Sequence, residues 1–480
     1  MRVTHSRSRR FLHGSCLVLA ALALLFSFGF EMQEIPEQHA DILDHFKYGS
    51  IGAEERAGLP YWIWRILPEV FEDLLPVHEG KGYARFGWVF ESESHSRPIG
   101  TSYRERMIPF LGVNCAVCHA GTLRESPSGT RRVILGMPSH QFDFQAYFRF
   151  LIACARDRRF ESSTLIAAMR KTNPKFSWID SLLYRFFVIE RTRNGILQQA
   201  GEFAWTESRP QQGPGRVDTF NPYKRMFDFD MTTDATVGTA DLPSLWNQKL
   251  REGMWLHWDG NNNAVTERNK SAAIGAGASE SSLDLPSMKR IEDWIRELKP
   301  PSFPAERIDR KLADEGQELF SRHCASCHSA GGERVGQVTP LEEIGTDAER
   351  LRSFTPALAE RMNTLGMGRS WRFSHFRKTQ GYANMPLDGL WLRAPYLHNG
   401  SVPTLTDLLA PMAERPTRFY RGYDVYDFDK IGFISDSPEA ARSGFQFDTW
   451  VKGNGNQGHS YGTDLPEPAK RKLLEYLKTL

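Results

Sequence analysis

Cys324-Ala325-Ser326-Cys327-His328 is the stretch around which this chain has to fold. Two cysteines three positions apart, followed directly by a histidine, form the attachment pattern of a c-type haem. The spacing has a chemical reason, because each thiol adds to one vinyl group of the porphyrin and the histidine binds the iron. A zinc or dithiol CxxC site would require a second ligand pair or a thioredoxin-like setting. Neither is visible in the sequence near Cys324.

The same pattern occurs earlier in the chain, as Cys115-Ala-Val-Cys118-His119. Of six cysteines, four belong to the two motifs. Cys16 lies near the N-terminus and Cys154 in an apolar run, so no disulfide framework is expected. The sequence therefore predicts two covalently bound c-type haems. The residues that hold them are Cys115, Cys118 and His119 for the first haem, and Cys324, Cys327 and His328 for the second.

Two amphipathic segments flank the second motif. Leu312 to Phe320 has apolar residues at helical spacing and runs directly into Cys324. Glu467 to Leu480 is the last segment of the chain and also has an apolar face. A helix that enters CxxCH, a glycine at position 316 that permits close approach, and a C-terminal helix predict the crossed first and last helices of a cytochrome c domain.

Length and composition set the outer limits. A chain of 480 residues is too long for one core and predicts two or three domains. The formal net charge is +2, which gives no reason to expect nucleic acid or an acidic membrane surface as a partner. The aromatic content is high, with 12 Trp and 31 Phe residues, which suits a protein that encloses large flat cofactors.

The N-terminus is predicted to direct export. Arg7, Arg9 and Arg10 precede an apolar run that extends to Phe30, and residues 1–29 are interpreted as a signal peptide. An uncleaved anchor in the inner membrane is the alternative, since the run is just long enough to span a bilayer. Either interpretation places the body of the protein in the periplasm, where c-type haem is assembled in bacteria.

The fold is expected to be mainly α, with two cytochrome c-like haem domains, long ordered loops and little β-structure. The N-terminal haem domain is assigned to residues 30–235, a Trp-rich connecting segment and linker to 236–304, and the C-terminal cytochrome c domain to 305–480. Ser139 is expected to cap a helix that ends at about Arg156.

Most of the chain beyond its N-terminal segment resembles the di-haem cytochrome c peroxidase superfamily and, within it, the rubber-oxygenase-like cytochromes c, and the motifs around the second haem are the most specific. The resemblance rests on Gly112-Val-Asn-Cys-Ala-Val-Cys-His-Ala-Gly121, Pro386-Leu-Asp-Gly-Leu-Trp391, Ala394-Pro-Tyr-Leu-His-Asn-Gly-Ser-Val-Pro-Thr-Leu405, Gly455-Asn-Gln-Gly-His-Ser-Tyr-Gly462 and Leu474 to Leu480. It implies an N-terminal haem where peroxide or dioxygen reacts and a C-terminal haem that handles electrons. The chain is short for a rubber oxygenase, so a polymer substrate is not expected.

The sixth ligand of the second haem has several candidates. Met385 follows His328 at a distance typical of small cytochromes c, and Met412 is placed relative to His398 as in a peroxidase. His398 lies in a Tyr-Leu-His-Asn-Gly loop, and His459 lies in a glycine-rich loop that would let an imidazole approach a porphyrin face. The resemblance favours His459, then His398, then the methionines.

No comparable ligand loop is visible for the first haem, so its distal side is expected to be open. Trp246 and Trp258 are expected to wall its pocket and to carry electrons between the haems. His95 and His140 could approach the first haem, but both are interpreted as structural histidines, as are His257 and His375. Asn114, Arg124, Arg216 and Arg393 are candidate partners of haem propionates.

The predicted function is an exported di-haem oxidoreductase that activates peroxide or dioxygen and exchanges electrons with a small donor or acceptor protein. Two alternatives are a di-haem electron carrier without a substrate and a haem subunit of a respiratory assembly. Length argues against the carrier, because simple carriers need about one small domain per haem.

Overall fold

A computed structural model describes residues 35–92 and 95–480. The predicted segment 1–29 lies outside these residues. Helix accounts for 42% of the structure and strand for 12%, which confirms the expectation of a mainly α fold. Among the described residues, no helix is both long and apolar enough to cross a membrane.

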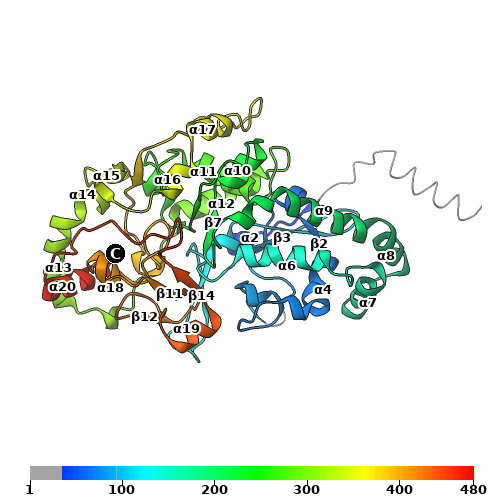
Figure 1. Ribbon diagram of the computed structural model, residues 1–480, viewed down its shortest axis with the longest axis horizontal. Coiled ribbons are helices and arrows are strands. Elements are labelled where there is room, and N and C mark those ends of the chain that lie inside the picture. The colour runs from blue at the N-terminus through cyan, green and yellow to red at the C-terminus, as the bar shows by residue number, and fades with distance from the viewer. Residues whose placement is uncertain (1–34, 93–94) are drawn as a thin grey trace, which may run out of the picture.

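Helices α6 to α9 of the first half lie at one end of the molecule, to the right in Figure 1, whereas α10 lies nearer the middle. Their bounds are α2 (Ile42–Tyr48), α3 (Glu54–Ala57), α4 (Tyr61–Val70), α5 (Ala116–His119), α6 (Phe144–Arg156), α7 (Ser162–Thr172), α8 (Trp178–Leu183), α9 (Ile189–Glu202) and α10 (Asn221–Met226). Asp143 caps α6 by accepting from the Ala146 amide. The prediction that Ser139 caps this helix was wrong, because the helix begins at Phe144, beyond the reach of Ser139.

Of the helices in the second half, α13, α14 and α20 lie at the opposite, left-hand end in Figure 1, whereas α11 and α12 lie near the middle. Their bounds are α11 (Val265–Gly275), α12 (Leu285–Glu297), α13 (Arg310–His323), α14 (Ala325–His328), α15 (Leu341–Ile344), α16 (Glu349–Ser353), α17 (Pro356–Met362), α18 (Leu405–Leu408), α19 (Pro438–Ser443) and α20 (Glu467–Leu477). α13 and α20 pack side by side. A Cβ at Gly316 would collide with the Lys472 carbonyl, so glycine permits this predicted crossing.

The strands are short. Their bounds are β1 (Ile35–Pro36), β2 (Leu59–Pro60), β3 (Thr101–Glu105), β4 (Phe110–Val113), β5 (Ala120–Leu123), β6 (Arg132–Leu135), β7 (Arg216–Asp218), β8 (Thr239–Asp241), β9 (Val338–Pro340), β10 (Gly381–Ala383), β11 (Arg418–Arg421), β12 (Tyr426–Asp427), β13 (Gly432–Phe433) and β14 (Phe445–Asp448). One antiparallel sheet has the order β1-β3-β4-β2 and leads into the first CxxCH motif. The other described strands form antiparallel pairs.

The core is shared between distant parts of the sequence. One apolar cluster is built from α4, α6, α7 and α9 with the sheet that precedes Cys115. A second cluster packs Leu123 and Ile134 from the first half against Trp246, Leu390 and Leu473. The proposed boundaries at 30–235, 236–304 and 305–480 stay a prediction, since apolar packing continues across them.

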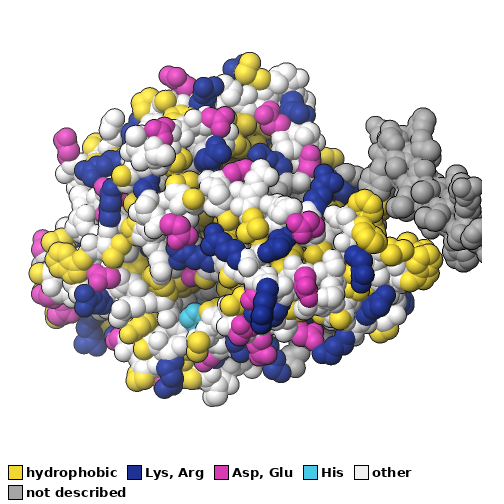
Figure 2. Space-filling model, turned by 45° about the vertical axis from the view of Figure 1, so that its right-hand side comes forward, with side chains coloured by type: hydrophobic (Ala, Val, Ile, Leu, Met, Phe, Trp, Pro, Cys, Tyr) yellow, Lys and Arg dark blue, Asp and Glu magenta, His cyan; other side chains and the backbone are white. Residues whose placement is uncertain are grey.

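Exposed apolar side chains are concentrated on α8 and the following π-helical turn η3 (Tyr184–Val188). Yellow side chains gather in Figure 2 on the side where Figure 1 places α8. The exposed residues there are Trp178, Ile179, Leu182, Phe186 and Phe187. Contiguous exposed apolar surface of this kind is typical of an interaction site or of the mouth of a binding groove.

Candidate functional site

The first CxxCH motif follows β4 as a tight helical turn. The Asn114 side chain sets this turn, because its amide donates to the Gly49 carbonyl (3.0 Å) and its oxygen accepts from the Ala116 amide (3.0 Å). Both ends of the Asn114 side-chain amide are therefore hydrogen-bonded to backbone groups, which makes Asn114 a poor candidate for a propionate partner. Cys115 and Cys118 form no disulfide, and burial raises the pKa of each thiol to about 12.

His119 is oriented by a backbone carbonyl. Its Nδ1 lies 2.8 Å from the Pro243 oxygen, and since a carbonyl only accepts, Nδ1 carries the proton. The lone pair is then on Nε2, the arrangement that metal-binding histidines use. Burial, followed by the nearby charge of Arg268, lowers the pKa of His119 to about 3, so the imidazole is neutral.

His119 and Cys118 open into a large cavity of about 2000 Å³. Ligand pockets are ordinarily about 300–1000 Å³, so this space exceeds what one compact ligand needs. The residues that line it are mostly apolar and include Leu111, Phe142, Tyr147, Leu151, Val188 and Ile196. Leu183 and Phe187 also line it, which joins the cavity to the exposed apolar surface of α8 and η3. Such a lining suits a haem, which is a flat apolar macrocycle with polar propionate groups at its edge.

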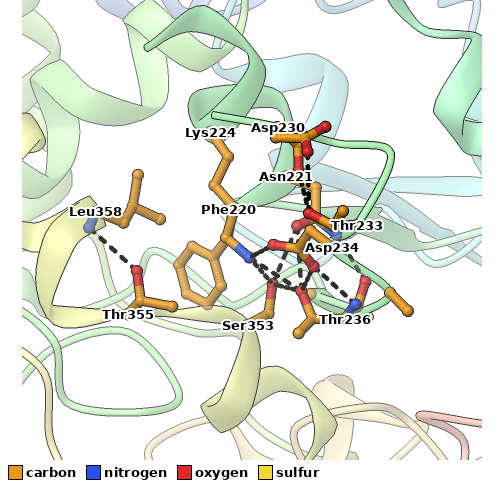
Figure 3. Close-up of polar contacts among 12 residues, drawn as sticks. Phe220, Asn221, Lys224, Asp230, Thr233, Asp234, Thr236, Ser353, Thr355 and Leu358 are labelled. Carbon is orange, nitrogen blue, oxygen red and sulfur yellow. Dashed lines mark hydrogen bonds and ion pairs between the residues drawn. The ribbon is translucent and has the colours of Figure 1, made fainter. Parts of the chain in front are cut away.

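The far wall of the cavity is held by a buried polar network. Phe220 and Tyr223 line the cavity from the start of α10. The adjacent Lys224 is fully buried, and its ammonium donates to Asp234 (2.7 Å) and Thr236 (2.9 Å) and contacts Ser353 (3.4 Å). Figure 3 shows this convergence, which fastens α10 to the end of α16.

The second motif begins where α13 ends, at Cys324, and α14 carries it to His328. His328 Nδ1 donates to the Met385 carbonyl at 2.7 Å, which again leaves Nε2 as the free lone pair. Burial lowers the pKa of His328 and raises that of the Cys324 thiol to about 11.

His459 faces His328. The two ring centroids are 6.2 Å apart, with an angle of 44° between the ring planes. Two imidazoles that bind one metal from opposite sides, with metal–nitrogen bonds of about 2 Å and ring centres about 1 Å further on, have centroids roughly 6 Å apart. The observed separation therefore fits one iron between the rings.

The loop that presents His459 is closely packed. Gly458 has a φ of +79°, and a side chain there would collide with the backbone of Gly345. The Arg415 guanidinium donates to the carbonyls of Asn456 (2.6 Å) and Gly458 (2.9 Å), which fixes the loop. Burial is the main cause that lowers the pKa of His459 to about 4, so this imidazole is also neutral.

The other three ligand candidates are placed differently. His398 is buried, stacks on Tyr382 with centroids 4.2 Å apart, and has its Nε2 3.1 Å from the Tyr382 hydroxyl. Met412 is 53% exposed on the surface. Met385 lies beside the site, since its carbonyl accepts from His328. His459 is the candidate whose ring faces His328.

Trp258 links the surroundings of the two motifs. Its indole donates to the Asp241 carbonyl (2.8 Å), two residues before the Pro243 carbonyl that holds His119. Its own carbonyl accepts from the Ala383 amide (2.9 Å), two residues before the Met385 carbonyl that holds His328. Trp258 therefore lies on a short connection between the two CxxCH histidines.

Trp246 has the position of a core residue. It is fully buried in the second apolar cluster, and its indole donates to the Leu135 carbonyl (3.1 Å). From the segment 246–258, His257 lines the cavity, whereas Trp246 and Trp258 do not belong to its lining. The catalytic role of Trp246 stays a prediction.

Of the remaining propionate candidates, Arg124 is already paired with Asp424 (2.7 Å). Arg216 is buried, and its Nε and Nη2 have no hydrogen-bond partner among the described residues. Arg393 donates to Pro386 and Asp388, while its Nε is unpartnered within the same part of the chain. Arg216 and Arg393 thus retain donors for a carboxylate.

Two cavity residues escaped the sequence reasoning. His257 was interpreted as structural, and Arg268 was not singled out, yet both line the cavity that contains His119. A cation one turn into α11 and a lone histidine in a tryptophan-rich loop carry no motif that would have identified them.

Comparisons with known proteins match the second half of the chain to two family models. The cytochrome c model matches residues 313–386, and the model of RoxA-like, cytochrome c-like domains matches residues 381–420. An uncharacterized protein, y4iJ, of Sinorhizobium fredii (strain NBRC 101917 / NGR234) is 26% identical over an alignment of 504 positions, and the alignment covers 83% of this chain and 81% of that protein. A second uncharacterized protein of the same strain, y4iM, is 31% identical over 285 residues, which cover 50% of this chain and 64% of that protein.

Proposed function

We propose, on the premise that this chain is a rubber-oxygenase-like cytochrome c, that it is an exported di-haem oxidoreductase with unequal haem sites. The matched models support a protein that carries covalent haem c and serves electron transfer or oxidation. The proposal adds a count of two haems, peroxide or dioxygen chemistry at the first haem, and electron transfer through the second.

The observation that carries the proposal is the contrast between the two proximal histidines. His328 has a second imidazole, that of His459, at the separation expected for one iron between them. His119 instead faces a cavity of about 2000 Å³. A saturated iron transfers electrons, whereas an iron with a free position also binds peroxide or dioxygen.

Different residues of the chain position the first motif, exclude water and connect the two sites. Asn114 and the Pro243 carbonyl hold the first motif in position. The apolar walls exclude bulk water from a reactive oxygen species, and haem, when bound, supplies the redox chemistry there. Trp258 offers an oxidisable side chain on the connection between the two proximal histidines.

The size of the first cavity favours an enzyme over a carrier. A carrier needs space for its haem alone, whereas this cavity continues to the exposed apolar surface of α8 and η3. We propose a small redox protein as the electron partner. The predicted export signal would place both proteins in the periplasm.

The experiment that tests the function uses the purified holoprotein. We expect the intact mass to exceed that of the polypeptide by two haems, and the protein to oxidise a reduced electron-donor protein when peroxide or dioxygen is added. His119→Gly should abolish this oxidation while the second haem keeps its spectrum. A wild-type protein that consumes neither oxidant would contradict the proposal.

A further inference from the structure

His257 is held in a backbone conformation that a bulky residue rarely adopts. Its φ is +62°, in the left-handed region that few non-glycine residues adopt. The surrounding loop is closed by a bridge between Leu256 and Asn262, with the Leu256 amide donating to the Asn262 carbonyl (2.6 Å). Strain of this kind persists at functional sites, where it fixes the direction of a side chain.

The His257 ring meets the cavity with an unsatisfied atom. His257 lines the cavity, and its Nε2 is buried without a hydrogen-bond partner in the described part of the chain. Buried polar atoms are nearly always satisfied, so an occupant of the cavity is the natural partner. Burial, followed by the charges of Arg268 and Arg350, holds the pKa of His257 well below its ordinary value. The imidazole is therefore a neutral base.

Arg268 brings a positive charge into the same space. It lines the cavity from the first turn of α11, and its charge reaches both His119 and His257. Within the described residues, its guanidinium has no carboxylate partner. Burial, followed by the charge of Arg251, lowers its pKa to about 10, so it remains a cation at neutral pH. Arg268 is half-buried, and a cation of this kind without a carboxylate partner favours an anion or a group that becomes negative during reaction.

We propose that His257 and Arg268 act together on a hydroperoxide bound in this cavity, as its base and its electrostatic stabiliser. The inference rests on the proposed function and selects peroxide over dioxygen as the oxidant. A neutral imidazole and a fixed cation in an apolar cavity match the needs of O–O cleavage, in which one oxygen loses a proton and the other leaves with negative charge.

The reaction balances as ROOH + 2 e⁻ + 2 H⁺ → ROH + H₂O. The O–O bond breaks and both oxygens are reduced, with the two electrons supplied by a reduced electron-donor protein. His257 accepts the hydroperoxide proton from one oxygen and returns it to the oxygen that leaves. Arg268 stabilises the negative charge on that leaving oxygen, and solvent supplies the remaining protons.

The test compares the holoproteins of wild type, His257→Leu, Arg268→Leu and Arg268→Lys, with His78→Leu as a control on an exposed histidine. Each is mixed rapidly with hydrogen peroxide, and the rate of the spectral change at the first haem is followed. His257→Leu and Arg268→Leu should each slow this change by about 10²-fold or more, as loss of a general base or of a stabilising charge does. Arg268→Lys should recover part of the rate, and His78→Leu should match the wild type.

Imidazole binding at the first haem provides the second readout. Imidazole needs no proton transfer, so both Leu variants should bind it at least as tightly as the wild type, which would also show that their cavities are intact. If the wild type reacts with peroxide and both Leu variants react at rates within threefold of it, the roles assigned to His257 and Arg268 are wrong, while the proposed function stands. If His257→Leu converts the first haem from low-spin to high-spin, His257 is an iron ligand. This result would also contradict the role of His257 as a base. A wild type that neither reacts with peroxide nor binds imidazole overturns the proposed function as well.

Discussion

The imidazole rings of His328 and His459 face each other with their centroids 6.2 Å apart, although one follows α13 and the other precedes α20. Both rings are neutral because burial lowers their pKa values. Neutral imidazoles are the form that binds a metal, so no proton has to be displaced when the iron is bound.

His459→Ala tests this arrangement. We expect it to convert the second haem from low-spin to high-spin, because the variant removes one of two strong axial ligands. Met412→Ala is the matched control and should leave the spectrum unchanged, since that side chain is 53% exposed. A methionine–iron band in the wild type that disappears in Met385→Ala would contradict the assignment.

The double variant Cys115→Ala, Cys118→Ala tests the haem count. Because each thioether bond requires a thiol, the denatured variant should retain one haem instead of two, as measured by intact mass. The corresponding change at Cys324 and Cys327 should remove the other haem. If the mass of bound haem is unchanged in either variant, the motif changed in that variant does not attach haem.

Trp258→Phe tests the connection between the sites. Phenylalanine keeps the packing but loses the hydrogen bond to Asp241 and the readily oxidised indole. We expect transfer of electrons from the second haem to the first to slow by about tenfold or more, which corresponds to at least about 1.4 kcal/mol in the barrier. Trp391→Phe serves as the control, since this buried tryptophan also donates its indole N–H to a backbone carbonyl, that of Pro301 (3.0 Å). Flash reduction of the second haem measures both variants. Equal slowing in the two variants would show that the effect is structural.

Asp424→Asn tests the junction between β5 and the C-terminal half. Asp424 accepts from Thr122 (2.9 Å), Arg124 (2.7 Å) and Arg131 (2.6 Å). Burial alone would raise its pKa, but these arginines bring the pKa below the ordinary value of 3.8. A lowered folded-state pKa stabilises the protein above the unfolded-state value, and this contribution is lost as the pH falls through the folded-state value.

The free energy of unfolding should therefore fall in Asp424→Asn by about 3 kcal/mol at pH 7, and the difference from wild type should shrink below about pH 4. Denaturant titrations at both pH values measure it. Asp436→Asn is the control at an exposed ion pair and should change stability by less than about 1 kcal/mol. If the difference in unfolding free energy between wild type and Asp424→Asn grows as the pH falls, the pKa of Asp424 is not lowered in the folded protein.

Local sequence patterns predicted the parts of the molecule that depend on neighbouring residues. The two CxxCH turns, the crossing of α13 and α20 at Gly316, and the glycine-rich loop of His459 all follow from spacing and backbone freedom. The resemblance to the rubber-oxygenase-like cytochromes c is confirmed by the family models that match residues 313–420.

Contacts between distant segments could not be predicted in this way. The pairing of Arg124 with Asp424 and the packing of Leu123 against Leu390 depend on tertiary structure that no periodicity encodes. His257 shows the same limit, because its direction depends on a left-handed backbone and its role on a cavity formed by helices far away in sequence. The interpretation of Ser139 as a cap failed for a local reason, since Asp143 stands nearer to the helix start.

The central claim is that one haem site is open and the other is closed, and a cyanide titration of the oxidised holoprotein tests it most directly. Electron-spin and optical spectra should show two different haems before the addition. Cyanide should shift the haem held by Cys115, Cys118 and His119, and should leave the haem between His328 and His459 unchanged. The account is contradicted if both haems are six-coordinate and bind no cyanide in the oxidised or the half-reduced protein.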